Sequence, residues 1–210
     1  MEQEFLNIFD RQRNPRGVAS REEVHRAGYW HETFHCWFIS EEDGVHYIYL
    51  QKRSALKKDY PDLLDITAAG HILAQETIQD GVREIKEELG IDVTFNELVP
   101  LGIIEYSHTR NEFIDNEISH VFLYKSQFSI NEYILQKEEV AGIVKAEFQD
   151  FSRLMLRDCD EIMVEGFEIN QFGKKITVRK QVRRKDFVPH EQSYYEDIID
   201  FITKEINNYL

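Results

Sequence analysis

The run from Arg83 to Ile91 places three carboxylates on one side of a predicted helix. At about 100° per residue, Glu84, Glu87 and Glu88 fall within an arc of roughly 100°. Like charges three and four residues apart repel each other, and the helix dipole disfavours anions in the last turns. A bound divalent cation would offset both penalties. This stretch therefore predicts a metal site.

The opposite side of the same helix is apolar, which predicts that it packs on a hydrophobic layer. That side carries Ile78, Val82, Ile85 and Leu89. Gly90 is placed to end the helix in a left-handed cap. We therefore predict an amphipathic helix over residues 77–89.

Hydrophobic periodicity divides the rest of the chain into strands and a few helices. Strands are predicted at residues 5–10, 29–39, 45–51, 95–106, 118–128 and 140–148. A capping box at Ser20 opens a short helix that Gly28 ends, and helices are predicted at 151–157 and 194–210. Polar segments are expected at 11–19, 52–64 and 107–115, and a hairpin over 165–179 turns at Gly173. This order predicts mixed α/β layers around one main core.

Composition narrows the class of protein. The 25 basic and 39 acidic residues give a net charge of −14, which argues against a general nucleic-acid binder. Cys36 and Cys159 are far apart, so neither a zinc motif nor a disulfide framework is indicated. No apolar run approaches the ~20 residues that span a membrane, and the acidic first residues lack a signal pattern. We expect a cytoplasmic protein.

A longer motif contains the acidic helix. Gly70 and Glu76, followed by Arg83-Glu84-Ile85-x-Glu87-Glu88-x-Gly90-Ile91, resemble the Nudix box. Six residues separate Glu76 from Arg83 where the family pattern has seven, which leaves the role of Glu76 open. The resemblance implies an α/β/α sandwich around a mixed sheet, with a C-terminal helix.

The resemblance also implies a chemistry. Glu84, Glu87 and Glu88 would bind Mg²⁺ or Mn²⁺, one of them could instead orient or deprotonate water, and Arg83 would hold them by ion pairing. Hard oxygen ligands suit Mg²⁺, which retains waters and phosphate oxygens. A cation there neutralises diphosphate charge and lowers the pKa of an attacking water. The expected reaction is cleavage of a diphosphate linkage.

Residues 1–150 resemble a narrower branch, the relatives of type 1 isopentenyl diphosphate isomerase. The matching segments are 27–37, 50–54, 65–71 and 113–117, with Lys57 and Pro61 between them. That isomerase places a metal on histidines and glutamates. His31, His71, Asp115 and Glu117 stand at matching positions, and His25 is a looser match.

One residue argues against isomerase activity. The isomerase needs a cysteine just before the Gly-His pair as a proton donor or acceptor at carbon, and here that residue is Ala69. Alanine cannot transfer a proton. Cys36 lies in a predicted strand and is interpreted as a buried small hydrophobe. The complete glutamate set further favours hydrolysis.

Other residues are candidates for the site. Glu117 is predicted to be an extra ligand or general base, whereas Glu139 could be a loop base or part of a solvated turn. His31, His35 and His71 could form a second metal site or serve the core. The residues predicted to bind substrate are Lys52, Arg53, Lys57, Gly70 and His71. The basic block 174–185 is interpreted as an exposed hairpin, with a role over the pocket as the alternative.

Together these observations predict a single Nudix domain over 1–210, with the box at 70–91 and a C-terminal extension at 150–210 packed on it. The favoured function is metal-dependent hydrolysis of a small organic or nucleoside diphosphate derivative. An isomerase and a non-catalytic diphosphate-binding protein are the alternatives. The expected partner is the small-molecule substrate, with no nucleic acid, no membrane and a possible homodimer.

Overall fold

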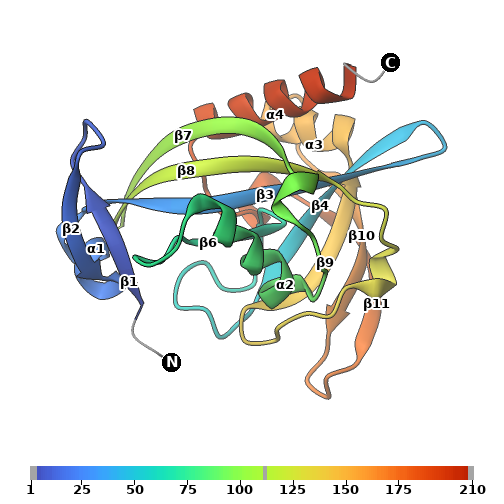
Figure 1. The fold of residues 1–210 in the computed structure, drawn as a ribbon. Coiled ribbons are helices and arrows are strands. Elements are labelled where there is room, and N and C mark those ends of the chain that lie inside the picture. The colour runs from blue at the N-terminus through green and yellow to red at the C-terminus, as the bar shows by residue number, and fades with distance from the viewer. Residues whose placement is uncertain (1–3, 111–112, 208–210) are drawn as a thin grey trace.

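A computed structural model describes residues 4–110 and 113–207, and its eleven described strands belong to one sheet (Figure 1). The strands are β1 (Phe5–Phe9), β2 (Pro15–Ser20), β3 (Trp30–Glu42), β4 (Val45–Arg53), β5 (Leu64–Asp65), β6 (Ala68–His71), β7 (Val99–Arg110), β8 (Phe113–Lys125), β9 (Val140–Glu147), β10 (Ile162–Ile169) and β11 (Lys175–Val182). The α-helices are α1 (Arg21–Ala27), α2 (Arg83–Leu89), α3 (Phe148–Met155) and α4 (Gln192–Asn207).

Strand β3 organises the sheet because it pairs with β1, β4, β6 and β8. Its pairing with β8 is parallel, whereas its pairings with β1, β4 and β6 are antiparallel. The parallel register sets His31 opposite Glu117, and the register with β6 sets Thr33 opposite His71. Backbone pairing alone thus gathers several of the predicted site residues.

Helices cover both faces of the sheet: Figure 1 shows α3 and α4 on one side and α2 on the other. Successive side chains of β3 point alternately to the two faces of the sheet. Trp37 packs in the core beneath α3 and α4, and Phe34 and Phe38 pack in the core beneath α2. Cys36 lies in the second core and is buried, as predicted. The predicted α/β/α architecture with a mixed sheet and a C-terminal helix is confirmed.

The predicted helix boundaries and turns have identifiable causes. The Ser20 side chain accepts a hydrogen bond of 3.3 Å from the Glu23 amide and opens α1. Gly28 ends that helix with φ 71°, and Gly90 ends α2 with φ 70°. Gly173 turns the β10–β11 hairpin with φ 76°. Positive φ favours glycine at each of these positions.

Several boundary predictions are wrong. Residues 15–19, expected in a polar turn, belong to β2, because they pair with β1 along its length. The strand predicted over 95–106 begins only at Val99, after a 3₁₀ turn (Phe95–Glu97). Residues 107–110 and 113–115, expected in a polar connection, continue β7 and β8, which pair with each other there. The helix predicted over 77–89 begins as a 3₁₀ turn (Ile78–Val82) and becomes α-helical only at Arg83.

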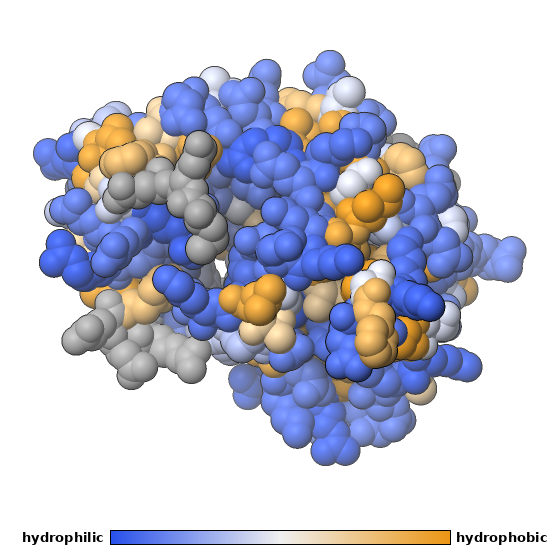
Figure 2. All heavy atoms as spheres, turned by 90° about the horizontal axis from the view of Figure 1, so that it is seen from below, coloured by the Kyte–Doolittle hydropathy of each residue, from blue (hydrophilic) through white to orange (hydrophobic). Residues whose placement is uncertain are grey.

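The surface agrees with the charged composition. Figure 2 shows hydrophilic residues over most of the face that it draws, with hydrophobic residues in separate patches. Among residues 4–110 and 113–207, no helix is long and apolar enough to cross a membrane.

Candidate functional site

Arg83, at the start of α2, joins the carboxylates of the box. Its Nε and Nη2 donate to the two oxygens of Glu76 over 2.5 and 3.0 Å. Its Nη1 donates to Glu84 over 2.6 Å and to Glu87 over 3.0 Å. Arg83 therefore makes the predicted ion pairs. Glu76 reaches the site despite the shorter loop, through a bidentate contact that suits a guanidinium.

Glu84 lies against the backbone of β6. A Cβ atom added to Gly70 would lie 2.1 Å from Glu84 Oε1, so only glycine leaves room for this carboxylate. Burial raises the pKa of Glu84 to about 7, although Arg83 opposes the shift. Displacing a proton with a cation would suit such a group.

Glu88 is buried one turn further along α2. Its Oε2 accepts hydrogen bonds of 3.2 Å from Gln51 Nε2 and from the Ala69 amide. Burial and the nearby Glu84 raise its pKa well above the usual range. Glu87 differs, because its side chain is 53% exposed and turns towards Arg83. Of the three predicted metal ligands, Glu84 and Glu88 are thus shielded from solvent, whereas Glu87 lies at the protein surface.

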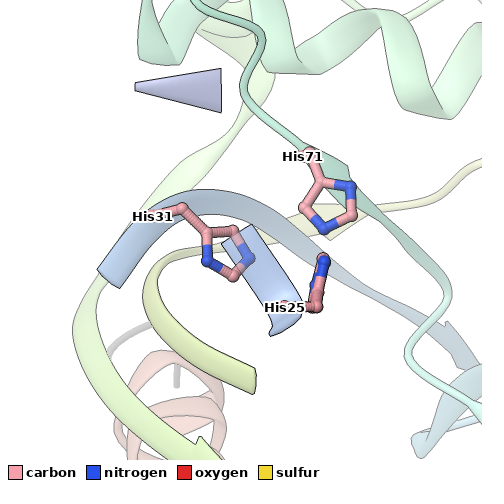
Figure 3. Close-up of side chains that lie close together, drawn as sticks. All are labelled: His25, His31 and His71. Atoms are coloured by element: carbon pink, nitrogen blue, oxygen red, sulfur yellow. The ribbon is translucent and has the colours of Figure 1, made fainter. Parts of the chain in front are cut away.

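A second cluster contains three histidines from different elements (Figure 3). His25 comes from α1, His31 from β3 and His71 from β6, with ring centroids 5.0 to 5.4 Å apart. The Nδ1 atoms of His25 and His31 lie 2.7 and 3.1 Å from the carbonyl oxygens of Arg21 and Tyr29. A carbonyl only accepts, so each Nδ1 carries a proton and each Nε2 keeps its lone pair.

The third histidine is held in the same way, by an acidic residue. His71 Nδ1 lies 3.3 Å from Glu4 Oε2. That hydrogen bond lowers the pKa of Glu4 to about 2. Carboxylates that hold one ring nitrogen of a histidine are common where the other nitrogen binds a metal.

Two carboxylates complete this cluster. Asp115 Oδ1 lies 3.4 Å from His25 Nε2 and 3.6 Å from His31 Nε2. The ligand atoms of His25, His31 and His71 lie within 4.8 Å of one another, and so do those of His31, Asp115 and Glu117. Burial lowers the pKa of His31 to about 3, which keeps its ring neutral.

The cluster fits a divalent cation. His31 Nε2 and Asp115 Oδ1 are buried and have no hydrogen-bond partner among the described residues. Such groups are rare in proteins because losing water without a new partner costs about 1–3 kcal/mol. Imidazole nitrogens with carboxylates suit a first-row transition metal better than Mg²⁺, which prefers oxygen.

His35 is not part of this ligand cluster. The structure groups His31 and His71 with His25, so the proposed set of His31, His35 and His71 is not the one that converges. His35 instead lies 3.3 Å from Glu117 Oε2. Burial opposes ionisation of Glu117, but the His35 hydrogen bond and the charges of the nearby histidines together outweigh it and hold the pKa of Glu117 well below its usual range.

A cavity of about 130 Å³ adjoins the second cluster. Of the predicted substrate residues, Arg53, Gly70 and His71 line it. Arg53 pairs with Asp65 over 2.9 Å. Lys52 and Lys57 lie outside the lining: Lys52 pairs with Glu168 over 2.8 Å, and Lys57 pairs with Glu139.

The basic block 174–185 lies on β11 and the turn that follows it. Lys180 pairs with Glu168 over 2.6 Å and Arg183 with Glu161 over 3.0 Å. Most of β11 is exposed. The block lies outside the cavity lining, which favours the exposed-hairpin interpretation.

Sequence reasoning missed several residues of this region. Tyr106, Val188 and His190 line the cavity, and Tyr194 bonds to His35 behind it. His190 Nε2 lies 3.0 Å from Asp65 Oδ1, next to the Arg53 ion pair. These residues belong to no motif in the chain. A sequence signal for this region is Asp65, the partner of His190, because it lies in a segment that resembles the isomerase.

Comparison with known proteins identifies the family to which the chain belongs. The family model described as the NUDIX domain matches residues 30–165. A Clostridium acetobutylicum protein named as an uncharacterized Nudix hydrolase is 43% identical, with 95% of this chain and 97% of that protein covered. The chain belongs to the Nudix family. Its similarity to this hydrolase confirms the enzyme class predicted from the box.

More distant matches include an isomerase and a solved structure with a similar fold. An isopentenyl-diphosphate Delta-isomerase from Photorhabdus laumondii is 29% identical over 57% of this chain and 66% of that one. A MutT/nudix family protein from Enterococcus faecalis has a similar fold, with a TM-score of 0.51 and 13% identity over 84% of this chain and 62% of that one.

The cavity of this Nudix protein contrasts with the needs of an isomerase. Ala69 contributes a methyl group to its lining, and no cysteine is among the described lining residues. Cys36 is buried in the core beneath α2, and burial raises the pKa of its thiol. The cysteine that the resemblance to the isomerase leads one to expect is therefore missing from the described lining, and Ala69 stands in its place.

Proposed function

We propose that this Nudix protein is a divalent-cation-dependent hydrolase of a small organic or nucleoside diphosphate derivative. One observation carries the proposal: two neighbouring carboxylates are shielded from water behind the cavity wall. Glu84 lies against Gly70 and Glu88 accepts a hydrogen bond from the Ala69 amide, and both Gly70 and Ala69 line the cavity. Neighbouring carboxylates without a cation repel each other: burial and the charge of Glu84 raise the pKa of Glu88, and burial and the charge of Glu87 raise the pKa of Glu84.

Two sets of residues would hold cations. Glu84, Glu87 and Glu88 would hold Mg²⁺ or Mn²⁺, and His25, His31, His71 and Asp115 would hold a second cation, with Glu117 beside it. When bound, such ions neutralise diphosphate charge and favour the hydroxide form of water. The histidine set supports the proposal through its buried atoms without partners.

The other residues are assigned roles from where they lie. Arg83 orients Glu84 and Glu87, and Glu117, which lines the cavity beside the histidines, would orient the attacking water or bind the second cation. Arg53, Gly70 and His71 would contact the substrate. Lys52 and Lys57 could bind phosphate only by exchanging their present carboxylate partners for it.

The proposal extends to the whole chain. We propose that residues 1–210 act as a single domain, because α3 and α4 share a hydrophobic core with β3 and β4. The cytoplasmic location and the homodimer stay predictions from the sequence, and the expected partner is the diphosphate substrate.

The test is hydrolysis of a diphosphate panel by the full chain. Nucleoside diphosphate sugars, dinucleoside polyphosphates and prenyl diphosphates would be offered with Mg²⁺ or Mn²⁺, and phosphate or monophosphate release measured. We expect chelation to abolish turnover and Glu84→Gln or Glu88→Gln to lower kcat by about 100- to 1,000-fold, the scale for a main electrostatic contributor.

The control is Glu41→Gln, which removes an exposed carboxylate on the β3–β4 hairpin and should leave kcat unchanged. Equal activity in all variants would contradict the metal assignment. Tight binding without turnover across the panel would favour a binding protein, and solvent deuterium in an allylic product would favour an isomerase.

A further inference from the structure

Four side chains form a chain of hydrogen-bond contacts from helix α4 to the active site. Trp37 Nε1 donates to the Tyr194 hydroxyl oxygen over 3.3 Å, and that oxygen lies 2.9 Å from His35 Nδ1. His35 Nε2 lies 3.3 Å from Glu117 Oε2 and 3.4 Å from Thr33 Oγ1. Trp37 and Tyr194 are 1% exposed and His35 is 4% exposed. Water therefore does not compete for these contacts.

The indole sets the direction of this chain. An indole N–H can only donate, so the Tyr194 oxygen accepts from Trp37 and its own proton is free to point at His35 Nδ1. A ring that accepts at Nδ1 carries its proton at Nε2, the atom that faces Glu117. Each hydrogen bond in this series of four side chains then has its donor on the side away from the Glu117 carboxylate.

The chain ends on one particular oxygen. Glu117 Oε2 also accepts from Thr33 Oγ1 over 3.2 Å and from Ser119 Oγ over 3.1 Å. The two hydroxyls and the nearby His35 Nε2 therefore surround Oε2 and fix the plane of the carboxylate. The second oxygen is the one left for a ligand in the cavity that Glu117 lines.

We propose that Tyr194 is a positioning residue of the active site, which acts through His35 to hold the Glu117 carboxylate in its working orientation. It does so from α4, outside the residues 30–165 that the family model matches. The C-terminal helix thus supplies a part of the site as well as a part of the core. Only the effect on turnover rests on the proposed hydrolase function.

The neighbouring tyrosine offers a matched control. The Tyr195 hydroxyl donates to the Val188 carbonyl over 2.8 Å, and its side chain is 3% exposed. Tyr194→Phe and Tyr195→Phe each remove one buried hydroxyl from the same helix. Only the first breaks the connection to His35.

The first readout is the tautomer of His35 in the metal-free full chain, measured by ¹⁵N imidazole NMR near pH 8. His35→Gln identifies the signal by its loss. We expect the Nε2–H tautomer in the wild type and in Tyr195→Phe, and a mixture with the Nδ1–H tautomer in Tyr194→Phe. A wild-type ring protonated at Nδ1, alone or at both nitrogens, would overturn the proposal whether or not the variants fold.

The second readout uses the diphosphate substrate. We expect Tyr194→Phe to lower kcat about 10-fold with KM changed less than twofold, at the lower end of the effect of groups that orient site residues. Tyr195→Phe should lose thermal stability to a similar degree and keep kcat. Equal kcat for both variants would contradict the proposal. A tautomer shift in a protein that hydrolyses nothing would leave the positioning role standing and defeat only the hydrolase.

Discussion

Gly70 and Glu84 approach so closely that no side chain fits between them. A Cβ at position 70 would lie 2.1 Å from Glu84 Oε1 and 2.2 Å from its Cδ. The backbone of Gly70 lies outside the left-handed region, so space and not conformational freedom explains the glycine. The match of Gly70 to the box therefore has a physical reason in this structure.

Gly70→Ala should displace the Glu84 carboxylate and leave the fold intact. A catalytic group moved by about 1 Å can lose about 100-fold in rate, and we expect a loss of that order in kcat/KM. The measurement is kcat/KM together with the Tm of the variant. Full activity with an unchanged metal requirement would show that Glu84 does not depend on this space.

Asp65 connects Arg53 with His190, and its charge should stabilise the fold in a pH-dependent way. Burial opposes ionisation, but the hydrogen bond from His190 and the charge of Arg53 outweigh it and lower the pKa of Asp65 from 3.8 to about 2. A carboxylate with a depressed folded-state pKa stabilises the protein above its unfolded pKa. That stability is lost as the pH falls towards the folded pKa.

Asp65→Asn should therefore reduce the free energy of unfolding by about 2 kcal/mol or more at pH 7, since 1.36 kcal/mol corresponds to one pKa unit. The difference from wild type should persist at pH 5 and shrink between pH 4 and pH 2. Urea unfolding at pH 7, 5 and 3 measures it. A difference that stays constant down to pH 3 would contradict the assigned cause.

Helix α1 carries His25 to the histidine cluster, although it comes before the residues that the family model matches. Its start at Ser20 and its end at Gly28 could be predicted from the sequence, because capping depends on a few adjacent residues. The Ser20 cap fixes where α1 begins and therefore helps to place His25 in the cluster.

Ser20→Ala removes the hydrogen bond to the Glu23 amide and should destabilise the protein by about 1 kcal/mol. Because α1 also holds His25, the affinity for Mn²⁺ should fall as well. Ser129→Ala is the control, since Ser129 caps a 3₁₀ turn by accepting from the Asn131 amide away from the cluster. Calorimetric titration should show weaker binding only in Ser20→Ala, and equal affinities would contradict the link.

Strands β7 and β8 show why other elements were harder to predict. The polar residues of 107–115 suggested a loop, yet Ser107 pairs with Asn116 and His108 with Asp115 in a regular ladder. Strands that carry a site place polar side chains where hydropathy expects apolar ones. The polar side chains that made these strands hard to predict include Asp115 and Glu117, which lie beside the histidines.

At the scale of the whole molecule, the candidate site is assembled from distant parts of the chain. The box could be found from its spacing, and His31, His71, Asp115 and Glu117 from the resemblance of short segments to the isomerase branch. Tyr194 could not, because 159 residues separate it from His35 and no local pattern marks the contact. The alternation of β3 and the packing of α4 decide such contacts, and both depend on the complete fold.

Metal binding should stabilise the whole molecule. Mn²⁺ at 100 times its dissociation constant should add about 2.7 kcal/mol and raise the Tm by about 5 to 10 °C in a chain of this size. His71→Gln should lose the part of this shift that comes from the histidine cluster and keep the part that comes from Glu84, Glu87 and Glu88. His46→Gln is the control, because His46 lies on β4 and pairs with Glu41 outside the cluster. Equal shifts in both variants, measured by calorimetric scanning, would contradict the assigned ligands.

The proposed reaction is attack of a water molecule on a phosphorus atom of the diphosphate. The most direct measurement is the reaction of the full chain, with Mg²⁺ and the best substrate of the diphosphate panel, in water enriched in ¹⁸O. Phosphorus NMR of the products should show one labelled oxygen per bond cleaved, and Glu88→Gln should slow its appearance by about 100-fold or more. Products without the label, or deuterium entering an allylic product in heavy water, would contradict the account.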